Sequence, residues 1–102
     1  MTLDEYQRKA AISMQPECRN INYLALGIAG EAGEICDKIK RIIRGDGQID
    51  DDLLYEIGDL LWYLSQLGDF LKVPLSKIAK MNLKKLSDRM AKNTIKGKGD
   101  KR

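Results

Sequence analysis

Apolar residues recur along this chain at the spacing of amphipathic helices. In four separate segments they return every three or four residues, which places them on one face of a helix. The predicted helices run from about Leu3 to Met14, from Asn20 to Arg44, from Asp52 to Leu71, and from Leu75 to Lys92. The pattern therefore predicts an all-α fold, an antiparallel helical bundle of about four helices.

Residues that cap or break a helix mark the ends of these segments. Thr2 and the acids Asp50–Asp52 precede two of the helices, and their side chains suit the free backbone amides of a helix N-terminus. Pro16 ends the first helix because proline disfavours helical geometry in the residue before it. Gly45 and Gly47 supply a turn. Packed antiparallel through this turn, the second and third helices can bring their edges face to face.

The apolar faces of the last three helices are the candidate core. They comprise Leu24, Ile28, Ile35, Ile39, Ile42 and Ile43, then Leu53, Ile57, Leu60, Leu61, Leu64, Leu67 and Leu71, and finally Leu75, Ala79, Leu83, Leu86 and Met90. Gly27, Gly30 and Gly33 interrupt the second helix, although each glycine costs about 1 kcal/mol relative to alanine. We interpret them as a stretch that another backbone or a ligand approaches closely, with local looseness as the alternative.

Two pairs of acids border these apolar faces. Glu31 and Glu34 lie on the second helix, and Glu56 and Asp59 on the third. Each pair is spaced i, i+3, so its two side chains stack on one helix face. Four facing carboxylates repel one another unless a divalent cation neutralises them, and oxygen ligands favour Mg²⁺ or Mn²⁺. The pattern predicts a metal site; the alternative is a helical oligomer whose acids are solvated.

Composition narrows the class of protein. The 102 residues, 43% apolar and 32% charged, indicate one small globular domain that could gain stability as an oligomer. We expect a cytoplasmic protein, because no apolar run is long enough for a membrane span and the N-terminus is unlike a signal peptide. The absence of histidine excludes serine–histidine and cysteine–histidine catalytic pairs and histidine-ligated zinc. Cys18 and Cys36 are expected to be reduced, with Cys36 in the core.

Basic residues give a net charge of +3 and gather late in the chain. We expect a domain over residues 1–92 and a basic flexible tail over 93–102. Lys38, Lys85 and Arg89 border apolar faces and are candidates to hold phosphate. Tyr63 or Trp62 could stack on a base, although Trp62 could instead anchor a subunit contact. The alternative function is a non-enzymatic adaptor that binds nucleic acid or a protein through its basic C-terminal region.

The acid pairs also carry a resemblance. Glu31-x-x-Glu34, followed after 21 residues by Glu56-x-x-Asp59, resembles the signature of the all-α nucleoside triphosphate pyrophosphohydrolase superfamily. The segments that are similar to its MazG-like branch are 26–34, 56–64, 81–86 with Arg89 after it, and the opening 3–7.

The resemblance implies a function and a set of site residues. Such enzymes use Mg²⁺ to cleave a nucleoside triphosphate to the monophosphate and pyrophosphate, in nucleotide-pool control or house-cleaning. They are homodimers or homotetramers of helical bundles, and neither a membrane nor nucleic acid is an expected partner. The implied metal ligands are Glu31, Glu34, Glu56 and Asp59, and the implied substrate contacts are Asn82, Lys85, Arg89 and Tyr63. Arg89 is followed by Met90-Ala91-Lys92, where many MazG-like chains have Tyr-Pro.

Overall fold

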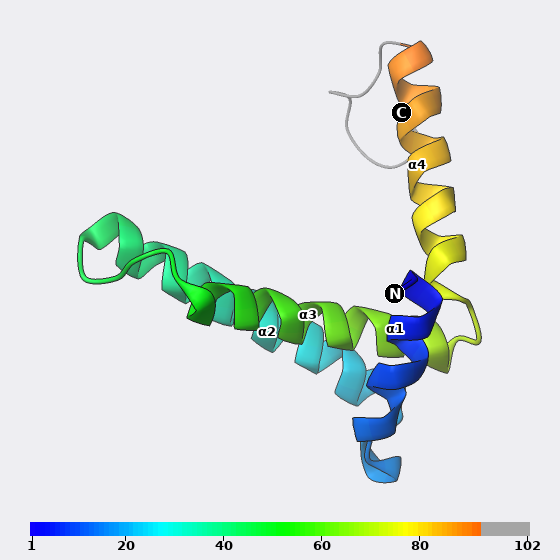
Figure 1. The fold of residues 1–102 in the computed structure, drawn as a ribbon, viewed down its shortest axis with the longest axis horizontal. Coiled ribbons are helices and arrows are strands. Elements are labelled where there is room, and N and C mark those ends of the chain that lie inside the picture. The colour runs from blue at the N-terminus through cyan, green and yellow to red at the C-terminus, as the bar shows by residue number, and fades with distance from the viewer. Residues whose placement is uncertain (93–102) are drawn as a thin grey trace.

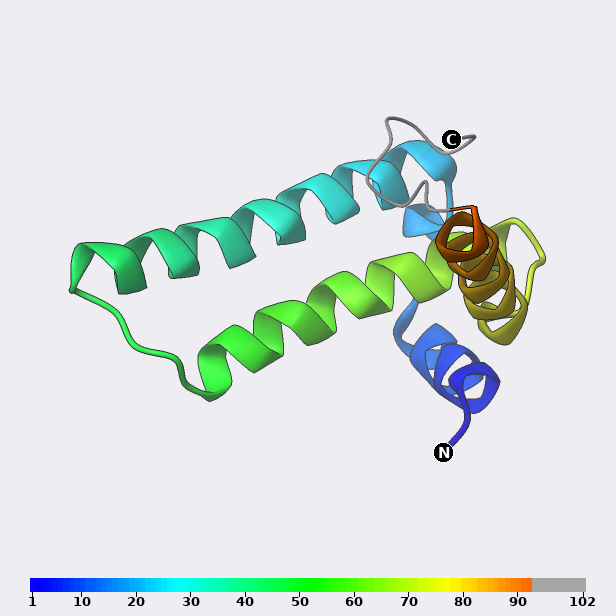
Figure 2. The same cartoon turned by 90° about the horizontal axis from the view of Figure 1, so that it is seen from above.

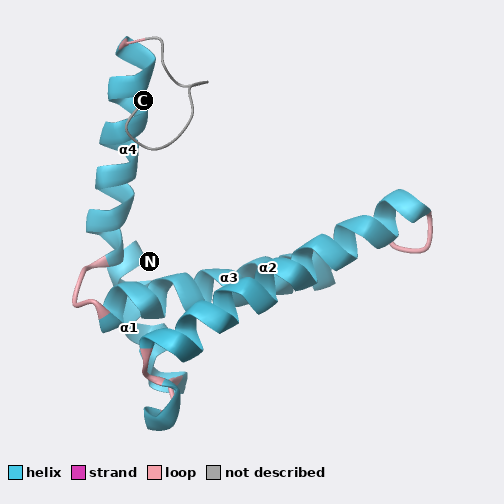
Figure 3. Cartoon of the chain, turned by 180° about the vertical axis from the view of Figure 1, so that it is seen from behind, coloured by secondary structure: helices cyan, strands magenta, loops and turns pink. Residues whose placement is uncertain are grey.

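The computed structural model describes residues 1–92, and every regular element within them is helical (Figures 1 and 3). In chain order the elements are α1 (Leu3–Ala10), the short 3₁₀ helices η1 (Ala11–Ser13) and η2 (Pro16–Cys18), α2 (Ile21–Arg44), α3 (Asp51–Phe70) and α4 (Leu75–Ala91). The all-α prediction is confirmed for these residues. None of the helices among them is long and apolar enough to cross a membrane, and the cytoplasmic location stays a prediction. The predicted tail, 93–102, lies outside the described residues.

The helices begin and end where local chemistry places their caps. The Thr2 hydroxyl accepts a hydrogen bond from the Glu5 amide at 3.0 Å, and the Asp50 carboxylate accepts one from the Asp52 amide at 3.1 Å. Helix α2 ends at Gly45, whose φ of 93° lies in the left-handed region that glycine tolerates best. Sequence-based boundaries for α2, α3 and α4 therefore agree with the structure to within one residue.

The first helix is shorter than its sequence predicts. The α-helix stops at Ala10 and one 3₁₀ turn follows, instead of a helix that continues to Met14. The indole of Trp62 donates to the Ala10 carbonyl oxygen at 3.0 Å and to the Ser13 hydroxyl at 2.9 Å. Because the Ala10 carbonyl oxygen accepts the bond from Trp62, the Met14 amide donates to the Ala11 carbonyl oxygen and not to that of Ala10. This i→i+3 bond tightens the last turn into a 3₁₀ helix. Trp62 thus anchors α1 within its own chain.

Helices α2 and α3 lie side by side and are joined at one end by the loop 45–50 (Figure 2). At the other end α1 packs against α3, and α4 starts there and projects away from the pair (Figure 1). The radius of gyration is 16.2 Å, whereas a compact chain of this length has about 13 Å. A single chain is therefore open, and the predicted assembly into a bundle of two or more chains stays a prediction.

The junction of α1, α3 and α4 is built around the side chain of Gln7, which is 5% exposed. Its amide nitrogen donates to the carbonyl oxygens of Ser65 at 3.0 Å and Val73 at 3.1 Å. Its amide oxygen accepts a hydrogen bond from the backbone amide of Leu75 at 3.0 Å. One buried side chain thus satisfies three backbone groups from α3, the connection and α4, and it fixes where α4 begins.

The core is smaller than the apolar pattern predicts. Of the apolar side chains in residues 1–92, Leu24 alone is fully buried. Cys36 is exposed, so its predicted place in the core is wrong, and both cysteines are free. Leu83 and Met90 on α4 are 66% and 69% exposed and are also wrong as core positions of a single chain. The exposed members of the predicted faces on the other helices are Ile39, Ile43, Ile57, Leu61, Leu64 and Leu71. They are exposed because α4 turns away and leaves these faces uncovered.

Candidate functional site

Three carboxylates meet between α2 and α3. Glu31 of α2 and Glu56 and Asp59 of α3 each offer an oxygen atom, and these atoms lie within 4.8 Å of one another. The two acids of α3 share a face because they are one helical turn apart. Glu31 and Glu56 are half-buried and Asp59 is exposed, so the group opens to solvent at the surface of the helix pair.

The acid group carries uncompensated negative charge. Burial, followed by the charges of Asp59 and Glu56, raises the pKa of Glu31 above its ordinary value. None of the ion pairs within residues 1–92 involves these three acids. A divalent cation would remove this repulsion, and the donor set of carboxylate oxygens is the one that Mg²⁺ and Mn²⁺ accept.

Glu34, the fourth predicted ligand, lies beside the group of three but not in it. Its side chain is exposed, and its charge contributes the smallest of the effects that raise the pKa of Glu31. The structure therefore brings three of the four predicted ligands together and leaves Glu34 at the edge.

An aromatic wall borders the acids one helical turn along the helix pair. Tyr63 follows Asp59 by one turn on α3, and its ring packs against Gly27 on α2 so closely that a Cβ at residue 27 would overlap it. The ring centroid of Tyr23 lies 6.3 Å from that of Tyr63. A close approach is therefore present at Gly27, but a side chain makes it, not another backbone or a ligand. Around Gly30 and Gly33 the described residues leave open space, so the prediction does not hold there for a single chain.

Two further tyrosines lie near the site, Tyr6 close enough to Asp59 to feel its charge and Tyr23 beside Tyr63. Burial, followed by the charge of Asp59, raises the pKa of Tyr6 on α1. Hydrogen bonding to Cys18, and then to Tyr63, raises the pKa of Tyr23 to about 12. Helical spacing relates residues only within one helix, so no sequence signal could bring Tyr6 of α1 to Asp59 of α3.

The predicted basic and amide contacts lie elsewhere on the chain. Lys38 lines a hollow of about 170 Å³ beside the α2–α3 loop. Lys38 lies seven residues after Glu31 on α2, which corresponds to about 10 Å along the axis of an α-helix. Asn82 and Lys85 line a hollow of about 330 Å³ on α4, and Arg89 is 5% exposed farther along that helix.

Helix α4 cannot bring these residues to the acids of its own chain. At about 1.5 Å per residue, Asp59 lies about 16 Å from the end of α3, and Lys85 lies about 15 Å beyond the start of α4. Because α4 projects away from the helix pair (Figure 1), these two lengths run in different directions from the junction.

Comparison with known proteins shows the family to which the chain belongs. The family model described as the MazG nucleotide pyrophosphohydrolase domain matches residues 19–93. The chain is also 45% identical over 87 residues to the Gene 37 protein of Mycobacterium phage L5, an alignment that covers 80% of this chain and 76% of that protein. No solved structure gives a significant match. The matched region contains the three clustered acids, Tyr63 and all of α4, and the chain belongs to the MazG nucleotide pyrophosphohydrolase family.

Proposed function

We propose that the chain is a Mg²⁺-dependent nucleoside triphosphate pyrophosphohydrolase, with Mn²⁺ as a second candidate ion. It would convert a (d)NTP and water to the (d)NMP and pyrophosphate, in nucleotide-pool control or house-cleaning. The observation that carries the proposal is the surface group of Glu31, Glu56 and Asp59, whose oxygen atoms lie within 4.8 Å of one another and whose burial and mutual repulsion raise the pKa of Glu31. Membership of the MazG family supports the same reaction.

Glu31, Glu56 and Asp59 would hold the ion, with Glu34 next to them. When bound, Mg²⁺ supplies charge neutralisation and polarisation of the phosphoryl oxygens. A carboxylate of the group accepts the proton of the attacking water, because the described residues and the rest of the sequence offer no histidine. The water oxygen bonds to the α-phosphorus, the bond from that phosphorus to the α–β bridging oxygen breaks, and pyrophosphate leaves with the electron pair.

The aromatic residues would position the nucleoside. Tyr63 is one helical turn from Asp59 and is wedged between α2 and α3 by its contact with Gly27. Its neighbours Trp62 and Tyr23, with ring centroids 5.0 and 6.3 Å away, restrict how far it can move. A fixed ring beside a phosphate-directed metal site suits the base or sugar of a nucleotide.

The open shape supports the predicted homodimer or homotetramer. The chain exposes 7704 Å², whereas a compact monomer of 11.5 kDa exposes about 5,800 Å². The excess is of the order that one chain buries in an obligate dimer. It includes an apolar stripe on α3 formed by Leu54, Ile57, Leu61 and Leu64. A second copy covering such faces would also carry an α4, and that helix could supply Asn82, Lys85 and Arg89 to the acids of its neighbour.

The activity test is a panel of nucleoside triphosphates with Mg²⁺, read by product identity. We expect monophosphate and pyrophosphate from at least one substrate, and none after chelation with EDTA. Glu56→Gln should abolish turnover with unchanged helix content, whereas Glu17→Gln, an exposed acid outside the group, should keep it. If no substrate yields pyrophosphate, and the chain instead binds nucleic acid in a salt-dependent way, the adaptor alternative gains support.

The sharing of sites between chains has its own test. Glu56→Gln and Lys85→Met chains carrying different tags are coexpressed, and the mixed dimer is purified. If each site takes its α4 from the second chain, one of the two sites of the mixed dimer contains both substitutions and the other contains neither. Activity should then return to about half of the wild-type value. If α4 serves its own chain, both sites keep one defect and the mixed dimer stays inactive, which refutes sharing while wild-type activity preserves the hydrolase proposal.

A further inference from the structure

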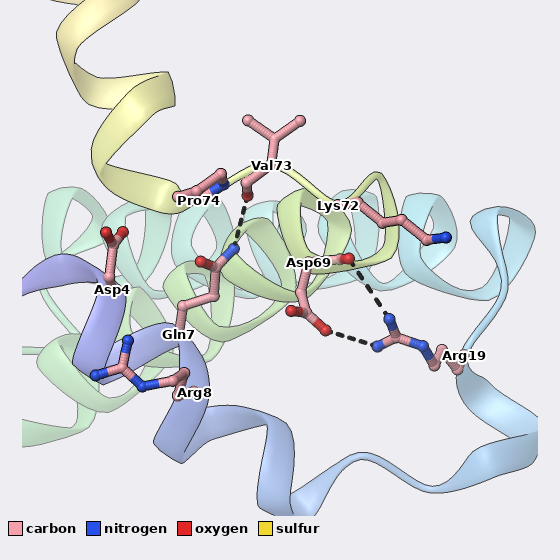
Figure 4. Close-up of a pocket in the computed structure, with 8 residues that line it drawn as sticks. All are labelled: Asp4, Gln7, Arg8, Arg19, Asp69, Lys72, Val73 and Pro74. Carbon is pink, nitrogen blue, oxygen red and sulfur yellow. Dashed lines mark hydrogen bonds and ion pairs between the residues drawn. The ribbon is translucent and has the colours of Figure 1, made fainter.

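A second pocket lies at the junction of α1 with the connection between α3 and α4 (Figure 4). Its volume is about 420 Å³, within the range of small-ligand sites. Gln7 forms part of its wall and is held by the hydrogen bonds that fix the junction. None of the three clustered acids lines it, so it is a site distinct from the candidate metal centre.

The acids of this pocket are already engaged. The Asp4 carboxylate accepts hydrogen bonds from the Ser76 amide at 2.8 Å and the Ser76 hydroxyl at 2.7 Å, at the start of α4. These bonds hold the pKa of Asp4 below its ordinary value, so the carboxylate stays ionised and committed to that helix end. Asp69 forms an ion pair with Arg19 at 2.8 Å. Asp4 keeps its negative charge, so the lining of the pocket carries two carboxylates against the three cations Arg8, Arg19 and Lys72, a net charge of +1.

The remaining basic groups of the pocket are not paired. Arg8 on α1 attracts Asp4 at longer range but makes no ion pair within residues 1–92, and Lys72 makes none there either. In Figure 4 the side chains of Arg8 and Lys72 lie on opposite sides of the pocket, and Arg19 lies on the side of Lys72. The pocket therefore has an excess of positive charge at its rim, which favours an anionic ligand.

The backbone of Lys72 is an independent observation. Its φ is 62°, and among residues 1–92 it is the sole non-glycine residue with a positive φ. Lys72 follows the end of α3 in a left-handed conformation, as Gly45 does at the end of α2. The backbone amide of Lys72 donates to the Asp69 carbonyl oxygen, and that of Val73 donates to the Gly68 carbonyl oxygen, both at 2.9 Å. Glycine adopts this conformation more easily than lysine. The left-handed turn costs more for lysine than for glycine, and it places Lys72 in the lining of the pocket.

We propose that this pocket binds a small phosphorylated anion, with the Lys72 ammonium and the Arg8 guanidinium contacting the phosphate from opposite sides. Arg19 lines the same pocket, but its charge is balanced by its ion pair with Asp69, so the free positive charge comes from Lys72 and Arg8. Lysine and arginine are the side chains suited to phosphate, the first as a point charge and the second as a fork of donors. Because α4 starts at this pocket, a phosphorylated ligand bound there can change the direction in which α4 projects.

The test measures binding to the full chain in EDTA, so that the acid group with its cation does not contribute. Inorganic phosphate, pyrophosphate and a nucleoside monophosphate are titrated separately and followed by NMR chemical shifts, which separates the possible sources of the phosphate group. We expect millimolar or tighter binding of at least one probe. Lys72→Ala should weaken it about tenfold, and Lys72→Arg should largely keep it.

Lys72→Gly separates the side chain from the backbone. It should lose binding as Lys72→Ala does, yet raise the thermal midpoint, because glycine relaxes the left-handed turn. Lys77→Ala, an exposed lysine on α4 outside the pocket, should leave affinity unchanged. The proposal is overturned if no probe binds at 10 mM, or if Lys72→Ala and Lys77→Ala weaken binding equally. Neither outcome depends on whether the chain hydrolyses nucleotides.

Discussion

Substitution of Gly27 tests the packing that positions Tyr63. In an ordinary helix interior, glycine to alanine stabilises by about 1 kcal/mol. At residue 27 the added Cβ would overlap the Tyr63 ring, whose neighbours Trp62 and Tyr23 limit its retreat. Overpacking of this kind costs about 1–3 kcal/mol, and the displaced ring also loses its contacts with α2.

The expected outcome is a net loss of up to about 2 kcal/mol for Gly27→Ala, after the helix gain of about 1 kcal/mol is subtracted from the overpacking cost. Gly30→Ala is the matched control, because the described residues leave open space there, and it should gain about 1 kcal/mol. For a chain of this size, 1 kcal/mol corresponds to about 4–8 °C in the thermal midpoint. The two variants should therefore move the midpoint in opposite directions.

Thermal and urea unfolding at a fixed protein concentration measure this difference. A Tyr63→Ala background gives the decisive comparison, because removal of the ring should turn Gly27→Ala from destabilising to stabilising. The reasoning fails if Gly27→Ala and Gly30→Ala change stability by the same amount, or if the sign for Gly27→Ala does not depend on Tyr63.

Two further predictions follow from the junction and the acid group. Gln7→Ala should destabilise by about 2–4 kcal/mol in urea unfolding, because it leaves buried backbone groups without partners, and the exposed Gln15→Ala should change little. Glu31→Gln should stabilise the metal-free chain at neutral pH, because a carboxyl with a raised folded-state pKa opposes folding once it is ionised. This advantage should shrink as the pH falls toward the ordinary pKa of 4.5, and Mg²⁺ should stabilise the wild type more than the variant. A constant difference across that pH range would contradict the assignment of repulsion from Asp59 and Glu56.

The positions of the four helices, and their ends except that of α1, were determined by the sequence itself. Helix formation depends on backbone hydrogen bonds between neighbouring residues and on short-range caps such as Thr2 and Asp50, which periodicity and residue type reveal. The same short-range rule placed Glu56 and Asp59 on one face of α3. The nature of the candidate site, a group of oxygen ligands between two helices, could therefore be predicted before any coordinates.

Only the tertiary structure decided which of these residues meet. The acid group takes in Glu31 and leaves out Glu34, because the relative rotation of α2 and α3 depends on contacts such as that of Tyr63 with Gly27. The direction of α4 depends on the strained turn at Lys72 and on the hydrogen bonds of Gln7 to backbone groups far along the chain. Periodicity carries no information about such contacts, since it describes each helix alone, and an apolar face looks the same whether its own chain or another covers it.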